Sequence, residues 1–145
     1  MDMMTAFDIA ASGMSAERTS MNVISMNLAN AKTTRTATGG PYQRKAVALR
    51  QAAVQSPFAS AMNSAMDEQL KGVKVAGIVT DNRPPRMVYE PGSPDADKNG
   101  YVSYPDINMV EEMTNMITTS RSYEANVASV NNVKTMYNKA LTIGS

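Results

Sequence analysis

The last forty residues of the chain carry an apolar spacing that few folds can accommodate. From Met109 to Leu141, alternate steps of four and three residues meet an apolar or aromatic side chain at eight of ten positions. This spacing places the side chains along one seam of a long helix, about 50 Å at 1.5 Å per residue. Such a helix needs a partner of similar length. The seam positions are Met109, Met113, Met116, Ser120, Tyr123, Val127, Val130, Lys134, Tyr137 and Leu141.

The amino-terminal residues repeat the same spacing. From Met3 to Ala31, steps of four and three meet an apolar side chain at eight of nine positions, and a sustained seven-residue period favours left-handed supercoiling. Thr5 and Asp8 have the spacing of a capping box, which predicts a helix start near Thr5. The seam positions are Met3, Phe7, Ala10, Met14, Glu17, Met21, Ile24, Leu28 and Ala31.

Both seams contain polar interruptions, at Glu17, Ser120 and Lys134, and asparagine is frequent beside them. An ordinary amphipathic helix buries its stripe in one globular core, and that alternative stays open. These surfaces are nevertheless too apolar to remain exposed to water and too polar to be buried in a single apolar core. We therefore expect seams that are shared between subunits. The expected interface residues are Phe7, Met14, Met21, Ile24, Leu28, Asn27, Asn30, Met109, Met113, Met116, Tyr123, Asn126, Val127, Val130, Tyr137 and Leu141.

Composition excludes several classes of function. Fourteen basic and thirteen acidic residues give a net charge of +1 without a basic stripe, so neither nucleic acid nor an anionic membrane is an expected partner. Cysteine and histidine are both absent, which removes thiolate chemistry, the commonest metal ligand and the commonest general base. No phosphate-binding or dinucleotide-binding glycine motif occurs in the sequence. We therefore expect no enzymatic activity and no cofactor.

The sequence also predicts how the chain is targeted. Its start lacks the positive charge and continuous apolar stretch of a cleavable signal peptide. No run approaches the roughly eighteen apolar residues that a membrane span requires, so direct membrane insertion is not expected.

The middle of the chain, residues 35–105, has a different pattern. Residues 42–51 and 72–80 alternate as strands do, and residues 86–90 form a further short apolar run. Two prolines at 84–85 favour an extended connection between the last two segments. Residues 56–69 have a weak helical spacing. The middle therefore predicts an extended, partly β region.

An acidic run precedes the carboxy-terminal helix. Asp95, Asp97, Asn99 and Gly100 match the first half of a calcium loop, but the twelfth position is Asp106 in place of glutamate. A Pro-Gly-Ser-Pro run before it excludes an entering helix. We favour a polar turn over a metal site at 95–106 and expect no bound metal.

Glu111 and Glu112 follow Asn108 where the last helix is predicted to begin. Adjacent helical residues face different directions, so the two carboxylates do not flank one substrate. First-turn acids instead stabilise the positive end of the helix dipole.

Several segments together resemble a known family. The run AFDIAASGMSAER at 6–18, followed by NVISMNLANAKTT at 22–34, is similar to the amino-terminal signature of the flagellar rod and hook family of bacterial axial proteins. Segments 34–45, 89–105, 111–117 and 121–126 look like those of proximal-rod members of that family. The resemblance covers nearly the whole chain.

This resemblance implies a structural subunit that is exported unfolded through the flagellar type III apparatus and polymerises helically into the rod that crosses the periplasm. The implied partners are further copies of the chain, other rod proteins, the rod-ring adaptor protein and the export apparatus. The implied function is to transmit torque. Ends that are disordered in the monomer and fold on assembly are a further implication.

Together, the patterns and the resemblance predict a mainly α fold. Residues 1–34 and 106–145 are expected to pair as a discontinuous coiled coil that lines an axial tube, with residues 35–105 as a smaller, partly β arm outside it. A helical adaptor or secretion chaperone that clamps a partner's helix is the alternative, and a calcium-binding module is a third possibility.

Overall fold

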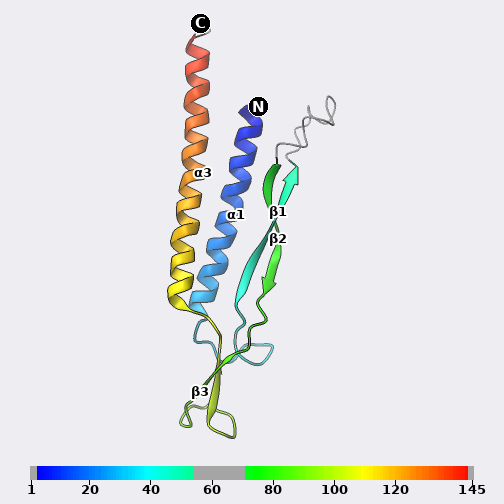
Figure 1. Cartoon of the computed structure of the whole chain (residues 1–145), viewed down its shortest axis with the longest axis vertical. Helices are drawn as coiled ribbons and strands as arrows, with labels where there is room; N and C mark the ends of the chain where they lie inside the picture. The colour runs from blue at the N-terminus through cyan, green and yellow to red at the C-terminus, as the bar shows by residue number, and fades with distance from the viewer. Residues whose placement is uncertain (1–2, 54–70, 144–145) are drawn as a thin grey trace.

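Two long helices dominate the computed structural model, which describes residues 3–53 and 71–143. Helix α1 spans Met3–Ala29 and helix α3 spans Met109–Ile143. The helices lie side by side in opposite directions, so that both chain termini are at one end (Figure 1). We call this the upper end, and the opposite end, where α1 ends and α3 begins, the lower end. The predicted mainly α class is confirmed.

The ends of the helices depart in one respect from expectation. Helix α1 already contains Met3 and Met4, so the predicted capping box at Thr5 is wrong. At the start of α3, the side-chain oxygen of Asn108 accepts hydrogen bonds from the backbone N–H groups of Val110 (3.0 Å) and Glu111 (3.4 Å). Asn108 thus caps α3, as its position before the first turn favours.

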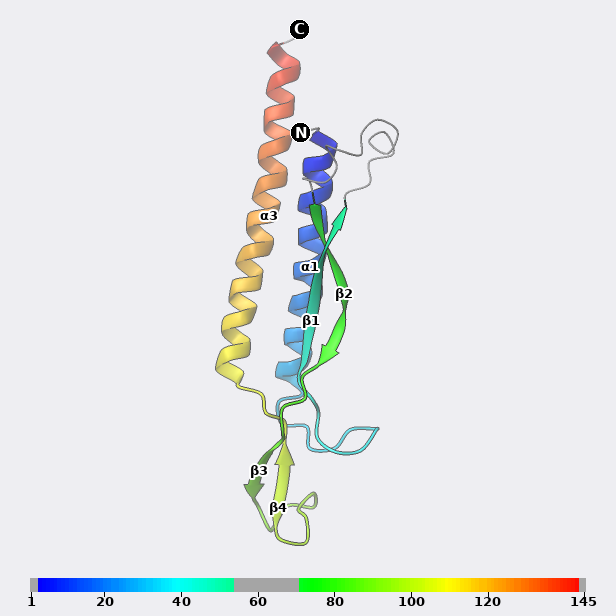
Figure 2. The same cartoon turned by 45° about the vertical axis from the view of Figure 1, so that its right-hand side comes forward.

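An antiparallel hairpin lies along the side of α1 away from α3 (Figure 2). It consists of β1, Lys45–Ala53, and β2, Lys71–Thr80, with a bulge between Ala48 and Leu49. The backbone N–H of Val73 donates to the Ser12 hydroxyl at 3.1 Å and ties β2 to α1. Helix α1 is therefore the middle layer, between α3 and the hairpin. Both strands were predicted; the weak helical spacing at 56–69, which left a short helix or a loop open, lies outside the described residues.

A second, shorter hairpin extends below the helices (Figure 1). It pairs β3, Arg86–Tyr89, with β4, Tyr101–Tyr104. The rings of Tyr89 and Tyr101 meet edge to face, 5.3 Å between centroids. Strand β3 was predicted, whereas β4 was not, because it lies within residues 95–106, directly after the acidic residues, and we interpreted that segment as a turn.

The buried interior is small. Among the described residues, the buried apolar side chains are Ala16, Val23, Val102 and Pro105, and the buried polar or charged ones are Asn27 and Glu112. Two of the largest fully buried side chains are thus polar, so polar contacts fix the junction of the elements at the lower end. No helix in the described part of the chain is both long enough and apolar enough to cross a membrane.

Candidate functional site

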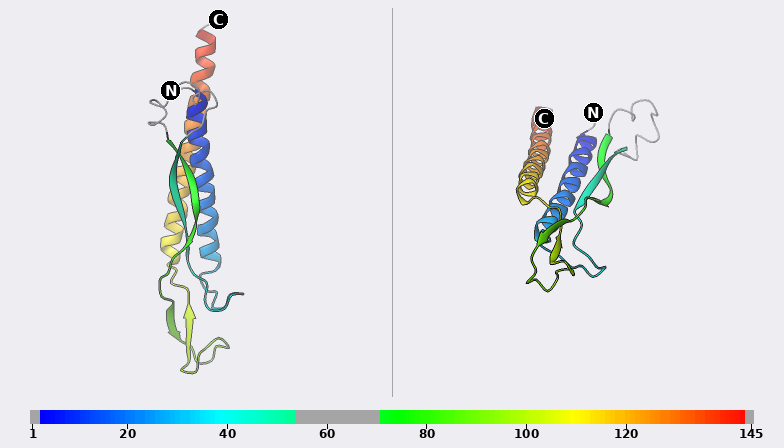
Figure 3. Two further views of the ribbon diagram at one scale, coloured as in Figure 1. Left: turned by 90° about the vertical axis from the view of Figure 1, so that its right-hand side faces the viewer. Right: turned by 60° about the horizontal axis from the view of Figure 1, so that its bottom comes forward.

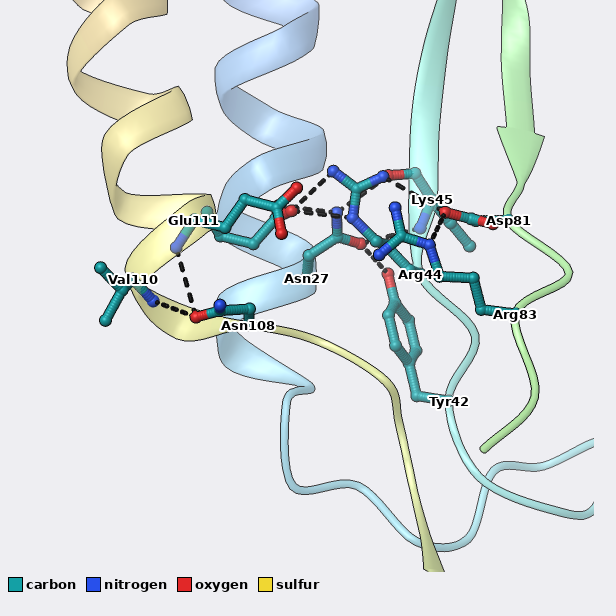
Figure 4. A network of polar contacts seen from close by, with 10 residues as sticks. Asn27, Tyr42, Arg44, Lys45, Asp81, Arg83, Asn108, Val110 and Glu111 are labelled. Carbon is teal, nitrogen blue, oxygen red and sulfur yellow. Dashed lines mark hydrogen bonds and ion pairs between the residues drawn. The ribbon is translucent and has the colours of Figure 1, made fainter. Parts of the chain in front are cut away.

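A polar network joins the two helices to β1 at the lower end (Figure 4). At its centre, Glu112 on α3 is 1% exposed. One carboxylate oxygen of Glu112 accepts from Arg44 Nη2 at 2.7 Å and Nε at 2.8 Å, and the other accepts from Asn27 Nδ2 at 3.0 Å. Charge-assisted bonds of this length are the stronger kind in proteins. We call Asn27, Tyr42, Arg44 and Glu112 the polar junction.

Asn27 on α1 uses both ends of its amide. Its oxygen accepts from the backbone N–H of Lys45 at 2.9 Å and from the Tyr42 hydroxyl at 3.1 Å. Its nitrogen donates to the Lys45 carbonyl at 2.8 Å as well as to Glu112. Because this amide pairs with both the backbone N–H and the carbonyl of Lys45, it fixes the position of the start of β1 on α1.

Further charged side chains extend outward from the polar junction. The guanidinium of Arg44 lies 3.6 Å from Asp81, and Asp81 pairs with Arg83 at 2.9 Å. Partial burial raises the pKa of Tyr42, and the negative charge of Glu112 raises it further. The neutral Tyr42 hydroxyl is therefore maintained as a donor toward Asn27.

This arrangement suits a structural role, in which it holds the elements in one geometry, rather than catalysis. Burying an ion pair costs desolvation energy that the mutual attraction only partly offsets, so its main effect is to require one geometry. Every member of the polar junction already has a protein partner. Sequence reasoning assigned Glu112 to the helix dipole alone and missed this network, because Arg44 lies 68 positions away in the chain.

The predicted seam residues of α1 lie beside the most buried positions of that helix. Phe7, Met14, Met21, Ile24 and Leu28 are half-buried. The buried positions of α1 are Ala16, Val23 and Asn27. Of these three, only Asn27 was among the expected interface residues. Asn30 is used locally, since its side chain donates to the Met26 carbonyl at 2.8 Å. The larger apolar side chains of α1 thus remain accessible on one side.

The predicted seam residues of α3 divide into two groups. Near the middle of the helix they are half-buried, namely Met116, Tyr123, Asn126, Val127 and Val130. Toward its two ends they are exposed, namely Met109, Met113, Tyr137 and Leu141.

One close approach holds the middle of the helix pair. A Cβ added at Gly13 on α1 would lie 2.9 Å from Asn126 Nδ2 on α3. Glycine therefore lets the two helices come together at this height, with the amide of Asn126 packed against the α1 backbone.

The acidic run at 95–106 has other roles in the structure. Asp95 accepts from the Thr34 hydroxyl at 2.7 Å and lies 3.9 Å from Arg35 Nε. Asp97 Oδ1 accepts from the backbone N–H groups of Asn99 (2.8 Å) and Tyr101 (2.9 Å) and so shapes the turn between β3 and β4. Within residues 3–53 and 71–143, no three acidic side chains gather into a group that could hold a metal ion.

Comparison with known proteins gives consistent matches over the whole chain. Residues 7–35 match the family described as "Flagella basal body rod protein", and residues 98–143 match "Flagellar basal body rod FlgEFG protein C-terminal". The flagellar basal-body rod protein FlgC of Salmonella typhimurium is 40% identical over 144 residues, 99% of each chain. FlgC of Bacillus subtilis is 41% identical over 97% of this chain and 99% of its own, and FlgC of Borreliella burgdorferi is 39% identical over 99% and 98%.

Proposed function

The chain belongs to the FlgC family of flagellar basal-body rod proteins, and we propose that it polymerises helically through its two terminal helices to transmit torque. Membership makes it a structural subunit of the basal body rather than an enzyme. We further propose export through the flagellar type III apparatus into a rod that crosses the periplasm. Its neighbours there would be further copies, other rod proteins and the rod-ring adaptor protein.

The exposed apolar side chains of α3 are the observation that supports assembly. Met113 is 55% exposed and Leu141 is 56% exposed, and they belong to the same predicted seam. Large apolar side chains that are exposed to water at both ends of one seam are typical of protein interfaces. Covering them with another subunit would release the hydrophobic free energy that the monomer leaves unused.

The proposed division of the chain follows the same logic. Residues 1–34 and 106–145 would form the axial core as a coiled coil, and residues 35–105 would lie outside it. The long antiparallel contact of α1 and α3 supports this proposal, as does the placement of both hairpins away from the face where α3 meets α1 (Figure 3).

An aspartate at an exposed seam position separates assembly from folding. Because Met113 is largely exposed, Met113→Asp should change the stability of the monomer by no more than about 0.5 kcal/mol. In an assembled seam, the same charge would be buried without a partner, at a cost of several kcal/mol. We expect export to continue while rod assembly and swimming are lost, and Val127→Asp should act in the same direction.

The matched control is Thr114→Asp, which introduces the same charge one position away on α3, at an exposed residue outside the seam. It should swim normally. Normal swimming of Met113→Asp, measured with secretion of the variant into the medium, would disprove the shared seam.

A further inference from the structure

A groove runs along α1 between α3 and the β1–β2 hairpin. Its upper part is a hollow of about 420 Å³. Helix α1 provides the floor, including Ala10 and Gly13, while Leu49 and Val73 of the hairpin and Val133 of α3 provide the walls. Small residues in the floor keep the hollow open, and apolar residues in the walls make it suited to an apolar occupant.

The same end of the molecule carries an uncovered apolar segment. Helix α3 continues beyond the start of α1 (Figure 3), and every residue from 134 to 142 is exposed. We call residues 134–142 the overhang. Tyr137 and Leu141 lie on one face of it, because residues four positions apart are neighbours on a helix surface, and Met136 is exposed on a different face. The overhang prolongs one wall of its own groove, so its apolar face cannot fold back into that groove.

Charge is complementary between the two surfaces. The overhang contains Lys134 and Lys139 and no acidic residue. The one charged residue that lines the hollow is Glu17, which has no ion-pair partner within the described parts of the chain. A cationic segment facing a groove that contains an unpaired carboxylate favours this pairing over a pairing of two like surfaces.

We propose that the overhang of one copy docks in the α1 groove of a second copy. Tyr137 and Leu141 would fill the hollow, and a lysine of the overhang would face Glu17. The contact joins two different surfaces, so it does not close into a dimer and can repeat along a polymer. This inference rests on the proposed function, because it assigns one specific contact to the helical assembly.

Cysteine cross-linking tests the contact directly, because the chain has no cysteine of its own. Full-length Ala10→Cys and Leu141→Cys variants, one of them tagged, would be mixed at associating concentration and oxidised. The mixed disulfide dimer should form about tenfold more than with the control pair Asn99→Cys and Leu141→Cys, because docking raises the effective thiol concentration. Asn99 lies at the tip of the lower hairpin, far from the groove.

Charge exchange provides the second measurement. Glu17→Lys alone, and Lys134→Glu with Lys139→Glu, should each lower the yield of the mixed dimer, and the combined exchange should restore it. Association without preferential Ala10–Leu141 cross-linking would overturn the groove contact and leave the proposed polymer intact. Absence of any association in sedimentation would count against the helical self-assembly as well.

Discussion

At the lower end of the helix pair the largest buried side chains on the two helices are polar, whereas the upper end exposes large apolar side chains. At the lower end, Asn27 and Glu112 are each 1% exposed, and no buried side-chain nitrogen or oxygen in the described part of the chain lacks a hydrogen-bond partner. At the upper end, α3 presents Met136, Tyr137 and Leu141 to water. The subunit thus uses polar contacts to set its geometry and leaves apolar surface for its neighbours.

This difference has an energetic reason. A buried, fully paired polar network contributes little net stability but strongly penalises any other arrangement. Apolar burial is non-directional and contributes free energy roughly in proportion to the area covered. A rod subunit needs a defined shape before assembly and a driving force during it. The polar junction meets the first requirement, and the exposed apolar side chains at both ends of α3 meet the second.

The largest effect should come from truncating the centre of the polar junction. Glu112→Ala leaves Arg44, whose side chain is 17% exposed, without its main partner and removes an acceptor from Asn27. Removing one member of a buried ion pair costs about 3–5 kcal/mol. Urea denaturation should show this loss. The control Glu111→Ala, at the exposed neighbouring position, should stay within about 0.5 kcal/mol. Equal effects of the two variants would show that the lower end is not the fixed one.

An intermediate effect is expected halfway along the helices. Gly13→Leu should force α1 away from α3 and cost about 1–3 kcal/mol, as overpacking typically does. Gly13→Ala should be nearly neutral, since its gain in helix propensity is offset by displacing the flexible Asn126 amide. In the Asn126→Ala background, Gly13→Ala should become stabilising in thermal denaturation. A Gly13→Ala change that stays neutral in that background would show that the amide is not the obstacle.

The smallest effect concerns alkaline pH. The pKa of Tyr42 is raised above its usual 10.0 in the folded state, mainly by burial and then by Glu112. The folded protein therefore retains this proton where the unfolded chain has lost it, so the contribution to stability is present below pH 10 and is lost as pH rises above it.

Tyr42→Phe should flatten this alkaline fall in the free energy of unfolding. Part of the fall should remain, because the hydrogen bond to Glu90 and the nearby charges raise the pKa of Tyr104 in the same direction. An unchanged pH profile in Tyr42→Phe would remove Tyr42 from the electrostatics of the polar junction.

Sequence patterns were sufficient for the helices and for three of the four strands. Steps of four and three residues identified α1 and α3 to within a few residues, because a long amphipathic helix repeats one signal many times. Strand β4 has only four residues, Tyr101–Tyr104, and follows an acidic run that carries a stronger turn signal. A short element next to a strong turn leaves too little pattern to detect.

Sequence patterns could not predict which helix faces pack together or which residues form the polar junction. The spacing argument gave weight to large side chains such as Phe7 and Met21, yet α1 is buried at Ala16 and Val23. Small side chains allow neighbouring elements to approach closely, but they contribute little to the hydrophobic pattern of a sequence. The partnership of Glu112 and Arg44 is set by tertiary folding, and nothing local distinguishes Glu112 from the exposed Glu111 beside it.

Hydrogen exchange along α3 tests the difference between the two ends most directly. In the dilute monomer, amides near residues 112–119 should exchange slowly, because the polar junction opposes local opening. Amides of residues 134–142 should exchange rapidly and become protected only in assembled rods. Uniform protection along the whole of α3 in the dilute monomer would contradict the account, since the upper end would then be fixed without any neighbour.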